Sequence, residues 1–252
     1  MSGKSCSLHW FLSSVIGSKE VNLSVYMRQP MPTAAKMDVG VRNTLSASSY
    51  SQFYRNGLKR VLDIVLVVLS AVPALTVVLF CAVLVALDGK SPFYTQLRVG
   101  RGGRTFRMLK LRSMVADADA LLAKHLQDDP AAQAEWAHTQ KLRNDPRITW
   151  IGRIIRKTSL DELPQLWNVL IGDMSLVGPR PMLPSQTDIY PGTAYYALRP
   201  GLTGFWQVSV RHESSFAERA RYDTAYLWEL SLRTDISVML RTVQVVLRGT
   251  GC

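Results

Sequence analysis

An acidic pair, Asp161-Glu162, lies in the stretch KTSLDELPQLWNVL at residues 157–170. Adjacent carboxylates can bind a hard metal ion, and one of them can act as a nucleophile. The pair also has a structural explanation, because Ser159-Leu160-Asp161-Glu162 matches the S-x-x-E capping box, in which Ser and Glu side chains satisfy amides at a helix start. The spacing of these residues alone does not choose between catalysis and capping.

Pro164 constrains the register of any helix that begins here. If Ser159 is the N-cap, Pro164 takes the fifth helical position, where its missing N–H forfeits a bond to Leu160. If Asp161 is the N-cap, Pro164 takes N3, where the N–H has no intrahelical partner anyway. One hydrogen bond favours the second register by about 1 kcal/mol. We therefore expect Asp161 to cap the helix, with its carboxylate ionised against the positive helix end.

Basic residues near the acidic pair supply groups that could bind phosphate. Arg156 and Lys157 precede the pair, and Arg180 lies between two prolines in the run GPRP at residues 178–181, which stiffens its backbone. A guanidinium held in this way suits bidentate contact with phosphate, although a lone surface arginine is often only a solvated charge. An ionised carboxylate among basic groups is a candidate nucleophile, metal ligand or both.

The most apolar part of the chain is residues 64–87, which contain no charged side chain (IVLVVLSAVPALTVVLFCAVLVAL). This length exceeds the ~18 residues at which a membrane helix becomes the first interpretation. A buried core helix is the alternative, but a helix that is apolar on all sides rarely suits a domain of this size.

Two features predict that this apolar segment does not cross a membrane straight. Pro73 lies near its middle and removes one helical hydrogen bond, and Ser70 could bond a freed carbonyl. Both flanks are basic, with eight Lys or Arg in residues 1–60 and seven in residues 88–112, and positive flanks favour the cytoplasmic side. We expect a re-entrant helix hairpin with its membrane bend at Ser70 and Pro73; a straight span is the alternative.

Regular elements follow the apolar segment. Residues 93–111 predict two strands around a Gly-rich turn at 100–103, which matches neither a P-loop nor the dinucleotide-binding pattern. The Ala-rich, charged residues 115–141 predict a solvated helix. The chain is helical again from about residue 215, and the apolar residues 235–248 suit either a helix at a membrane interface or an ordinary domain helix.

Taken together, several stretches resemble the bacterial sugar transferase family, the small monotopic polyprenyl-phosphate phosphoglycosyl transferases. The resemblance covers residues 57–248 and is most specific in SLDELPQL…GDMSLVGPRP. It is also carried by KRVLDIVLVVLS, FYTQLRVG, FRMLKLRSM, LRPGLTGFWQVS and RYDTAYLWELSLRTDI. The tail is similar to the short members that start exopolysaccharide synthesis, among them galactose-1-phosphate transferases.

The resemblance implies a transferase on the cytoplasmic face of the bacterial inner membrane. Such an enzyme moves a sugar-1-phosphate, here galactose or glucose, from a UDP-sugar to undecaprenyl phosphate and releases UMP. This is the first membrane step of exopolysaccharide biosynthesis. Asp161 would attack the sugar-bearing phosphate and carry the phosphosugar, and Glu162 would help Asp161 to hold Mg²⁺. Arg156, Arg180 and Arg211 match family arginines that would bind phosphate groups.

The expected architecture is a membrane-associated α+β protein in three parts. These parts are a flexible tail (residues 1–56), a re-entrant membrane helix (57–88) and a compact cytoplasmic catalytic domain with interfacial helices (89–252). Lys59, Arg60 and Asp63 match the family's K-R-x-x-D entry to the membrane helix.

The expected partners are a UDP-sugar, undecaprenyl phosphate and membrane lipid, without nucleic acid, and a homodimer is left open. The net charge of +11 fits any anionic partner. The alternative is therefore a membrane-tethered, basic nucleic-acid-binding or scaffolding protein. That alternative gives the Asp161-Glu162 pair no role, and no recognisable nucleic-acid-binding motif accompanies the charge.

Overall fold

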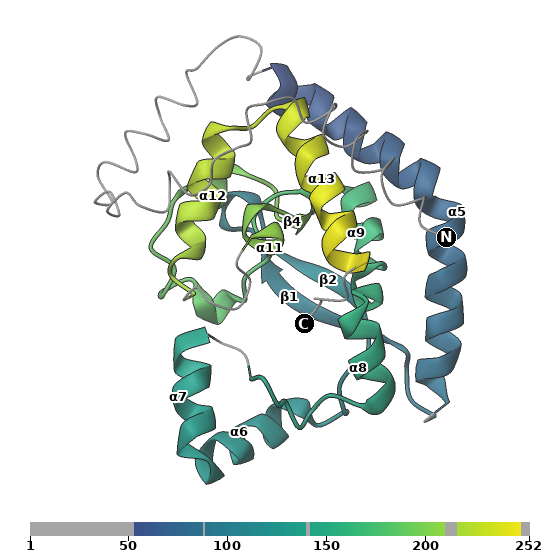
Figure 1. The fold of residues 1–252 in the computed structure, drawn as a ribbon, viewed down its shortest axis with the longest axis vertical. Coiled ribbons are helices and arrows are strands. Elements are labelled where there is room, and N and C mark those ends of the chain that lie inside the picture. The colour runs from purple at the N-terminus through teal and green to yellow at the C-terminus, as the bar shows by residue number, and fades with distance from the viewer. Residues whose placement is uncertain (1–52, 88, 140–141, 210–215, 248–252) are drawn as a thin grey trace, which may run out of the picture. The chain divides into compact units, whose positions relative to one another are not determined.

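A computed structural model describes residues 53–87, 89–139, 142–209 and 216–247, all of which belong to one unit of the chain, Thr33–Cys252 (Figure 1). The described part combines helices with two small sheets, so the expected α+β class is confirmed. The expected tail at residues 1–56 lies outside the description except for its last four residues, which are already helical.

The apolar segment forms one continuous helix, α5 (Lys59–Ala86), preceded by a short π-helical turn, η1 (Tyr54–Leu58). Within the part of the chain that the structure describes, α5 is the one helix long and apolar enough to cross a membrane. Figure 1 shows that α5 bends along its length and does not double back on itself. Entry and exit by the same membrane face therefore stays a prediction.

Pro73 lies inside α5 without ending it. Its missing N–H frees the carbonyl of Leu69, four residues earlier. Ser70 Oγ instead donates to the carbonyls of Leu66 and Val67, at 2.8 and 3.1 Å. The prediction that Ser70 bonds a carbonyl freed by the proline is therefore wrong. The hydroxyl bonds carbonyls one turn earlier in the helix and not the freed carbonyl of Leu69.

One face of α5 packs against the rest of the unit near both ends of the helix. Two core clusters include residues of α5. The first contains Val67 of α5 with Phe106, Met108, Val169 and Met174. The second contains Cys81, Ala82 and Val85 of α5 with Leu111 and Ile155. The opposite face exposes apolar side chains, among them Leu69 (73% exposed) and Val72 (77% exposed). Continuous exposed apolar surface of this kind marks a membrane or partner contact.

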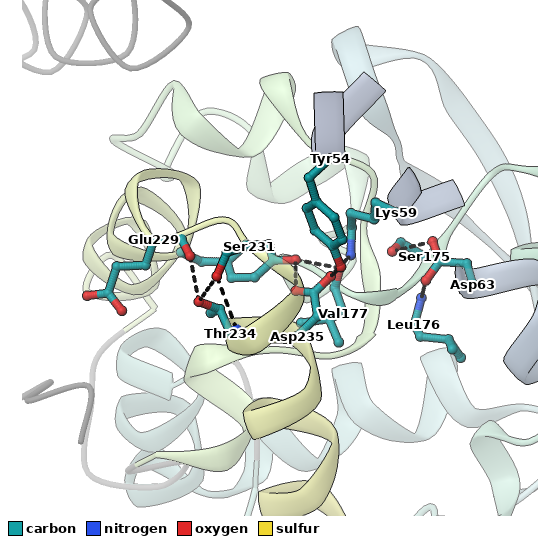
Figure 2. Close-up of polar contacts among 11 residues, drawn as sticks. Tyr54, Lys59, Asp63, Ser175, Leu176, Val177, Glu229, Ser231, Thr234 and Asp235 are labelled. Atoms are coloured by element: carbon teal, nitrogen blue, oxygen red, sulfur yellow. Dashed lines mark hydrogen bonds and ion pairs between the residues drawn. The ribbon is translucent and has the colours of Figure 1, made fainter. Parts of the chain in front are cut away.

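A buried polar network joins the start of α5 to α13 (Leu232–Leu247), as Figure 2 shows. Tyr54 Oη and Lys59 Nζ both donate to one carboxylate oxygen of Asp235, each at 2.6 Å, and Tyr226 Oη donates to the other oxygen at 2.7 Å. Since each carboxylate oxygen is hydrogen-bonded and a lysine supplies the opposite charge, this buried carboxylate is well compensated.

Two further residues of the K-R-x-x-D motif fix α5 to other elements. Asp63 accepts hydrogen bonds from Ser175 Oγ at 2.7 Å and from the N–H of Leu176 at 3.1 Å (Figure 2). Arg60 donates to the carbonyls of Val169 and Leu170 at the end of α9 (Gln165–Ile171). The motif therefore works as an anchor that ties the apolar helix to three separate elements.

Two small sheets form the strand part of the fold. β1 (Phe93–Val99) and β2 (Thr105–Leu111) pair in antiparallel register around a short 3₁₀ turn, η2 (Arg101–Gly103), which confirms the predicted hairpin. β3 (Ser175–Val177) and β4 (Gly201–Thr203) form a short parallel pair.

The remaining helices are short. They are α6 (Ala118–Asp128), α7 (Pro130–Thr139), α8 (Trp150–Lys157), α10 (Ala194–Ala197), α11 (Phe205–Val208) and α12 (Arg219–Trp228), with 3₁₀ turns η3 (Leu160–Glu162) and η4 (Pro184–Gln186). The single helix predicted at residues 115–141 is two helices. Asp129 separates them, because its backbone is extended and its Oδ1 accepts from the N–H groups of Ala131 and Ala132 at the start of α7.

Candidate active site

The acidic pair lies on the 3₁₀ turn η3 and not at the N-cap of an α-helix. Ser159 has a left-handed backbone (φ 57°) and makes no capping bond with its side chain, while Pro164 is the N-cap of α9. Both the Ser159 capping box and the Asp161 N-cap register are therefore wrong. The amides are satisfied within successive tight turns, as in the bond from the N–H of Glu162 to the carbonyl of Ser159 at 3.2 Å.

The buried side chain of Asn168 positions the acidic pair relative to β2. Its Oδ1 accepts from the N–H of Leu109 at 3.0 Å, and its Nδ2 donates to the carbonyl of Arg107 at 2.8 Å. The amide thus pairs with the edge of β2 as a neighbouring strand would. Because α9 follows η3 and Lys110 follows Leu109, this contact sets how close Lys110 comes to the acidic pair.

Lys110 bridges the two carboxylates. Its Nζ lies 2.9 Å from Glu162 Oε1 and 3.4 Å from Asp161 Oδ2. Asp161 is 5% exposed, so it is buried, whereas the side chain of Glu162 is 21% exposed. Burial is the largest effect on the pKa of Asp161 and raises it. The positive charge of Lys110 lowers this pKa, the negative charge of Glu162 raises it, and Arg156 lowers it. The net result is a raised pKa. Positive charge around Asp161 is therefore what favours its ionised form.

Two of the three predicted arginines, Arg156 and Arg180, lie near the acidic pair. Arg156, in α8, is near enough to Asp161 to lower its pKa electrostatically. Arg180 Nη2 lies 3.4 Å from Glu162 Oε1, and the guanidinium lies 5.9 Å from the ring centroid of Trp206. The structure therefore brings Arg156 and Arg180 to the acidic pair. Arg211 lies outside the described residues.

The loop that carries Arg180 is fixed by the parallel strands β3 and β4. The N–H of Gly178 donates to the carbonyl of Thr203, and the N–H of Gly201 donates to the carbonyl of Pro179, both at 2.8 Å. A Cβ atom on Gly201 would lie 2.1 Å from the nitrogen of Gly178. Only glycine permits so close an approach of two backbones. The position of the loop that carries Arg180 therefore depends on glycine at position 201.

A small pocket, open to solvent, lies beside the acidic pair. It is lined by Arg98, Met108, Lys110, Glu162, Gln165, Arg180, Pro181, Gly201 and Leu202. Three of these side chains are basic and one is acidic, so the pocket suits an anionic group.

Lys110 and Arg98 were missed as site residues by reasoning from the sequence, where they counted only as basic charges beside the membrane segment. The pattern of β2 contains a signal for Lys110. Phe106 and Met108 are buried, and side chains two residues apart share one face of a strand. A lysine at the next inward position has to meet a counter-charge inside the protein, and that counter-charge is the acidic pair.

The acidic pair fits Mg²⁺ in the type of its ligand atoms. The described residues contain no group of three or more His, Cys, Asp or Glu side chains placed to hold a metal ion. Mg²⁺, however, is commonly bound by one or two carboxylates, with substrate phosphates and water as the other ligands. Lys110 already shows that a positive charge is accommodated between Asp161 and Glu162.

Comparison with known proteins gives consistent matches along the described unit. Residues 54–249 match the family model described as Bacterial sugar transferase. The "UDP-galactose-lipid carrier transferase" of Erwinia amylovora is 46% identical over 220 residues, which are 85% of this chain and 44% of that relative. The "Exopolysaccharide production protein ExoY" of Sinorhizobium fredii is 41% identical over 196 residues, 77% of this chain and 87% of the relative.

A third relative is named for a different sugar. The "UDP-glucose:undecaprenyl-phosphate glucose-1-phosphate transferase" of Caulobacter vibrioides is 40% identical over 202 residues, 75% of this chain and 69% of the relative. The chain spans less than half the length of several curated relatives that it matches. The family match covers most of the chain, from η1 to beyond the end of α13. This protein therefore belongs to the bacterial sugar transferase family.

Proposed function

We propose that this protein transfers a sugar-1-phosphate, galactose or glucose, from a UDP-sugar to undecaprenyl phosphate and releases UMP, as the first membrane step of exopolysaccharide synthesis. The observation that carries the proposal is the buried Asp161, bridged by Lys110 to Glu162, beside a pocket lined by basic side chains. The names of relatives, which include galactose and glucose transferases acting on undecaprenyl phosphate, support the same chemistry.

The proposed reaction has two displacements at one phosphorus atom. An Asp161 carboxylate oxygen attacks the sugar-bearing phosphorus; a new P–O bond forms, the P–O bond to UMP breaks, and UMP leaves with the electron pair. The phosphate oxygen of undecaprenyl phosphate then attacks the same phosphorus, and the Asp161 carboxylate is the leaving group. Splitting one transfer into two steps in this way is nucleophilic catalysis.

The other site residues stabilise negative charge on Asp161 and on the phosphate groups. Lys110 and Arg156 favour the ionised form of Asp161, since both oppose the effect of its burial on the pKa. Arg180, held beside Glu162, is placed to neutralise phosphate oxygens. When bound at Asp161 and Glu162, Mg²⁺ would supply further neutralisation of the diphosphate. In the described part of the chain the acidic pair and its basic neighbours thus provide a nucleophile and phosphate-binding groups.

The anchoring of α5 supports the proposed entry and exit by the same membrane face. Near its start, Asp63 is bonded to Ser175 and Leu176, and near its end the carbonyl of Val85 accepts from Arg112 Nη2 at 3.2 Å. A straight helix of 28 residues would extend about 42 Å at ~1.5 Å per residue and separate these two ends across a bilayer. Binding of both ends to one folded unit favours the re-entrant arrangement on the cytoplasmic side.

Exposed tryptophans support interfacial helices in addition to α5. Trp150 and Ile154 on α8 are 74% and 49% exposed, and Trp167 and Ile171 on α9 are 59% and 53% exposed. Tryptophan favours the boundary between lipid and water, so α8 and α9 are proposed to rest on the membrane surface. α13, for which the sequence left an interfacial and an ordinary domain helix open, contributes exposed Val243 but also carries the buried Asp235.

The experiment that tests the proposed function measures UMP release from a panel of UDP-sugars with undecaprenyl phosphate in detergent or lipid. We expect UMP release with UDP-galactose or UDP-glucose, and its loss in Asp161→Asn. Absence of UMP release with every UDP-sugar by a folded protein would leave the alternative, a membrane-tethered scaffold or nucleic-acid-binding protein, as the better account.

A further inference from the structure

Three arginines from separate elements form a cluster beside the acidic pair. Arg98 lies on β1, Arg180 on the GPRP loop and Arg219 at the start of α12. Arg180 and Arg219 both face the ring of Trp206, with guanidinium-to-centroid distances of 5.9 and 4.2 Å. Burial, followed by the positive charge of Arg180, lowers the pKa of Arg98 to about 10 and that of Arg219 to about 9.

Among the residues that the structure describes, nearby carboxylates balance the positive charge of this arginine cluster poorly. Glu162, which raises the pKa of Arg98, is already bridged by Lys110. Asp223 is near Arg219, but burial raises its pKa to about 7, so it is only partly ionised at neutral pH. Like charges held together without full compensation are unfavourable unless an anion joins them, and the pocket that Arg98 and Arg180 line is open to solvent.

Arg98 has the hydrogen-bonding capacity to meet such an anion. Its two terminal nitrogens donate to the carbonyl of Pro181 and to Gln96 Oε1, at 3.1 and 2.5 Å. These contacts hold the guanidinium against the GPRP loop. Its buried Nε has no hydrogen-bond partner among the described residues, and the side chain lines the pocket together with Arg180. A buried donor without a partner is rare in folded proteins and calls for a ligand.

We propose that Arg98 is a further substrate-binding residue, which together with Arg180 binds the diphosphate group of a nucleoside diphosphate donor in the pocket beside Glu162. This inference rests on the proposed function and adds a residue to it. A diphosphate offers pairs of oxygens on neighbouring phosphorus atoms, and two planar guanidinium groups can contact them in bidentate fashion. Arg219, whose guanidinium lies 4.2 Å from the ring centroid of Trp206, contributes a third positive charge.

The test measures the dissociation constant of UDP for the purified full-length protein without lipid acceptor, by calorimetric titration. Arg98→Met keeps the length of the side chain and removes its charge. We expect its affinity for UDP to fall by about 10- to 100-fold, the range for loss of a charge-assisted hydrogen bond. Binding of uridine, which has no phosphate, should change little. UDP affinity within about twofold of the unchanged protein would overturn the proposal.

Arg104→Met is the matched control, because Arg104 is an exposed arginine next to the turn of the same β-hairpin. It removes the same charge and should bind UDP normally. If Arg98→Met does not fold, Arg98→Lys answers the question, since lysine keeps the charge but cannot form the bidentate contact. A folded Arg98→Lys protein with unchanged UDP affinity would count against the inference, and an intermediate loss would support it.

The phosphate of the lipid acceptor has the same chemistry and is distinguished by a second measurement. If Arg98 serves that phosphate, UDP affinity stays unchanged in Arg98→Met while the KM for undecaprenyl phosphate rises, which would overturn the assignment to the donor. Failure of the proposed function looks different. In that case the unchanged protein itself neither binds UDP nor releases UMP from a UDP-sugar.

Discussion

At the scale of single residues, the candidate site depends on the contact between Lys110 and the acidic pair. Adjacent carboxylates repel each other, and a buried one ionises only when positive charge is near. Lys110 contacts both carboxylates, and it also opposes the rise in the pKa of Asp161 that burial causes. In the proposed reaction, this lysine therefore favours the ionised, nucleophilic form of Asp161.

Lys110→Met tests this role through the pH dependence of turnover. Without the lysine, the pKa of Asp161 should rise further, so the pH at which kcat/KM reaches half of its maximum should move upward. Activity at pH 7 should fall by about 10- to 100-fold, since an interaction with a charged group contributes roughly 1.5–3 kcal/mol. Lys157→Met, which removes an exposed lysine next to the site, is the control. An unshifted pH profile for Lys110→Met would argue against this role.

Asp223 gives a prediction about stability and pH. This buried carboxyl accepts a hydrogen bond from Tyr190 Oη at 2.5 Å, and burial raises its pKa to about 7. In the unfolded chain the pKa is about 3.9, so the folded protein binds the proton more tightly. Its contribution to stability is complete below about pH 4 and is lost as the pH rises through about 7.

We therefore expect the melting temperature to fall between about pH 4 and pH 7, and Asp223→Asn to reduce this fall. The effect on the free energy of unfolding is at most roughly 4 kcal/mol, from a difference of about three pKa units. Thermal unfolding in detergent across this pH range is the measurement. Asp188→Asn, at an exposed position, should behave like the unchanged protein; equal pH profiles for both variants would contradict the assignment to Asp223.

Sequence reasoning at this scale found the residues that belong to short motifs and missed those that meet through the fold. Asp161, Glu162 and Arg180 stand in recognisable local patterns, and the structure brings them together. The alternation in β2 indicates that Lys110 points inward, but its contact with the acidic pair, and the place of Arg98, depend on how β2 and β1 lie against η3 and the GPRP loop.

At the scale of elements, the apolar helix and the Arg180 loop are parts of one assembly. Asp63 of α5 bonds Ser175 and Leu176 of β3, and the loop that carries Arg180 follows β3 directly. The same strand pairs with β4, where Gly178 and Gly201 approach too closely for any side chain. A disturbance of the helix anchor is therefore expected to reach Arg180.

Asp63→Ala tests this coupling. It leaves the N–H of Leu176 without its partner, which should destabilise the protein by about 1–3 kcal/mol and lower its melting temperature. Because the loop shifts, the KM for the UDP-sugar should rise as well. Thr76→Val is the control, since Thr76 Oγ1 donates to the carbonyl of Val72 within α5 itself. Unchanged melting temperature and KM in Asp63→Ala would show that the anchor is not coupled to the loop.

The elements themselves were largely predictable where local chemistry determines them. Alternating residues around glycines predicted the β1–β2 hairpin, and the apolar run predicted α5. The register at residues 159–164 was not predictable, because Ser159 adopts a left-handed backbone that serine seldom takes, and tertiary contacts such as those of Asn168 hold the turn in place.

At the scale of the whole molecule, the proposed topology keeps both ends of α5 on one side of the membrane. Cysteines placed at Phe53, just before the helix, and at Lys90, just after it, should both resist an impermeant reagent in intact cells and react after permeabilisation. The three native cysteines, Cys6, Cys81 and Cys252, are replaced by serine, and a known periplasmic cysteine is the positive control. Labelling of one position alone in intact cells would favour a straight span.

The central claim is that Asp161 is a covalent nucleophile, and peptide mass spectrometry after incubation with the productive UDP-sugar tests it most directly. Without lipid acceptor, we expect a burst of about one UMP per active enzyme and a phosphosugar on the peptide that contains Asp161. Asp161→Asn, which removes the nucleophile with little change in shape, should fold and form neither. A protein that releases UMP only when undecaprenyl phosphate is present, with no adduct on that peptide, would contradict the claim.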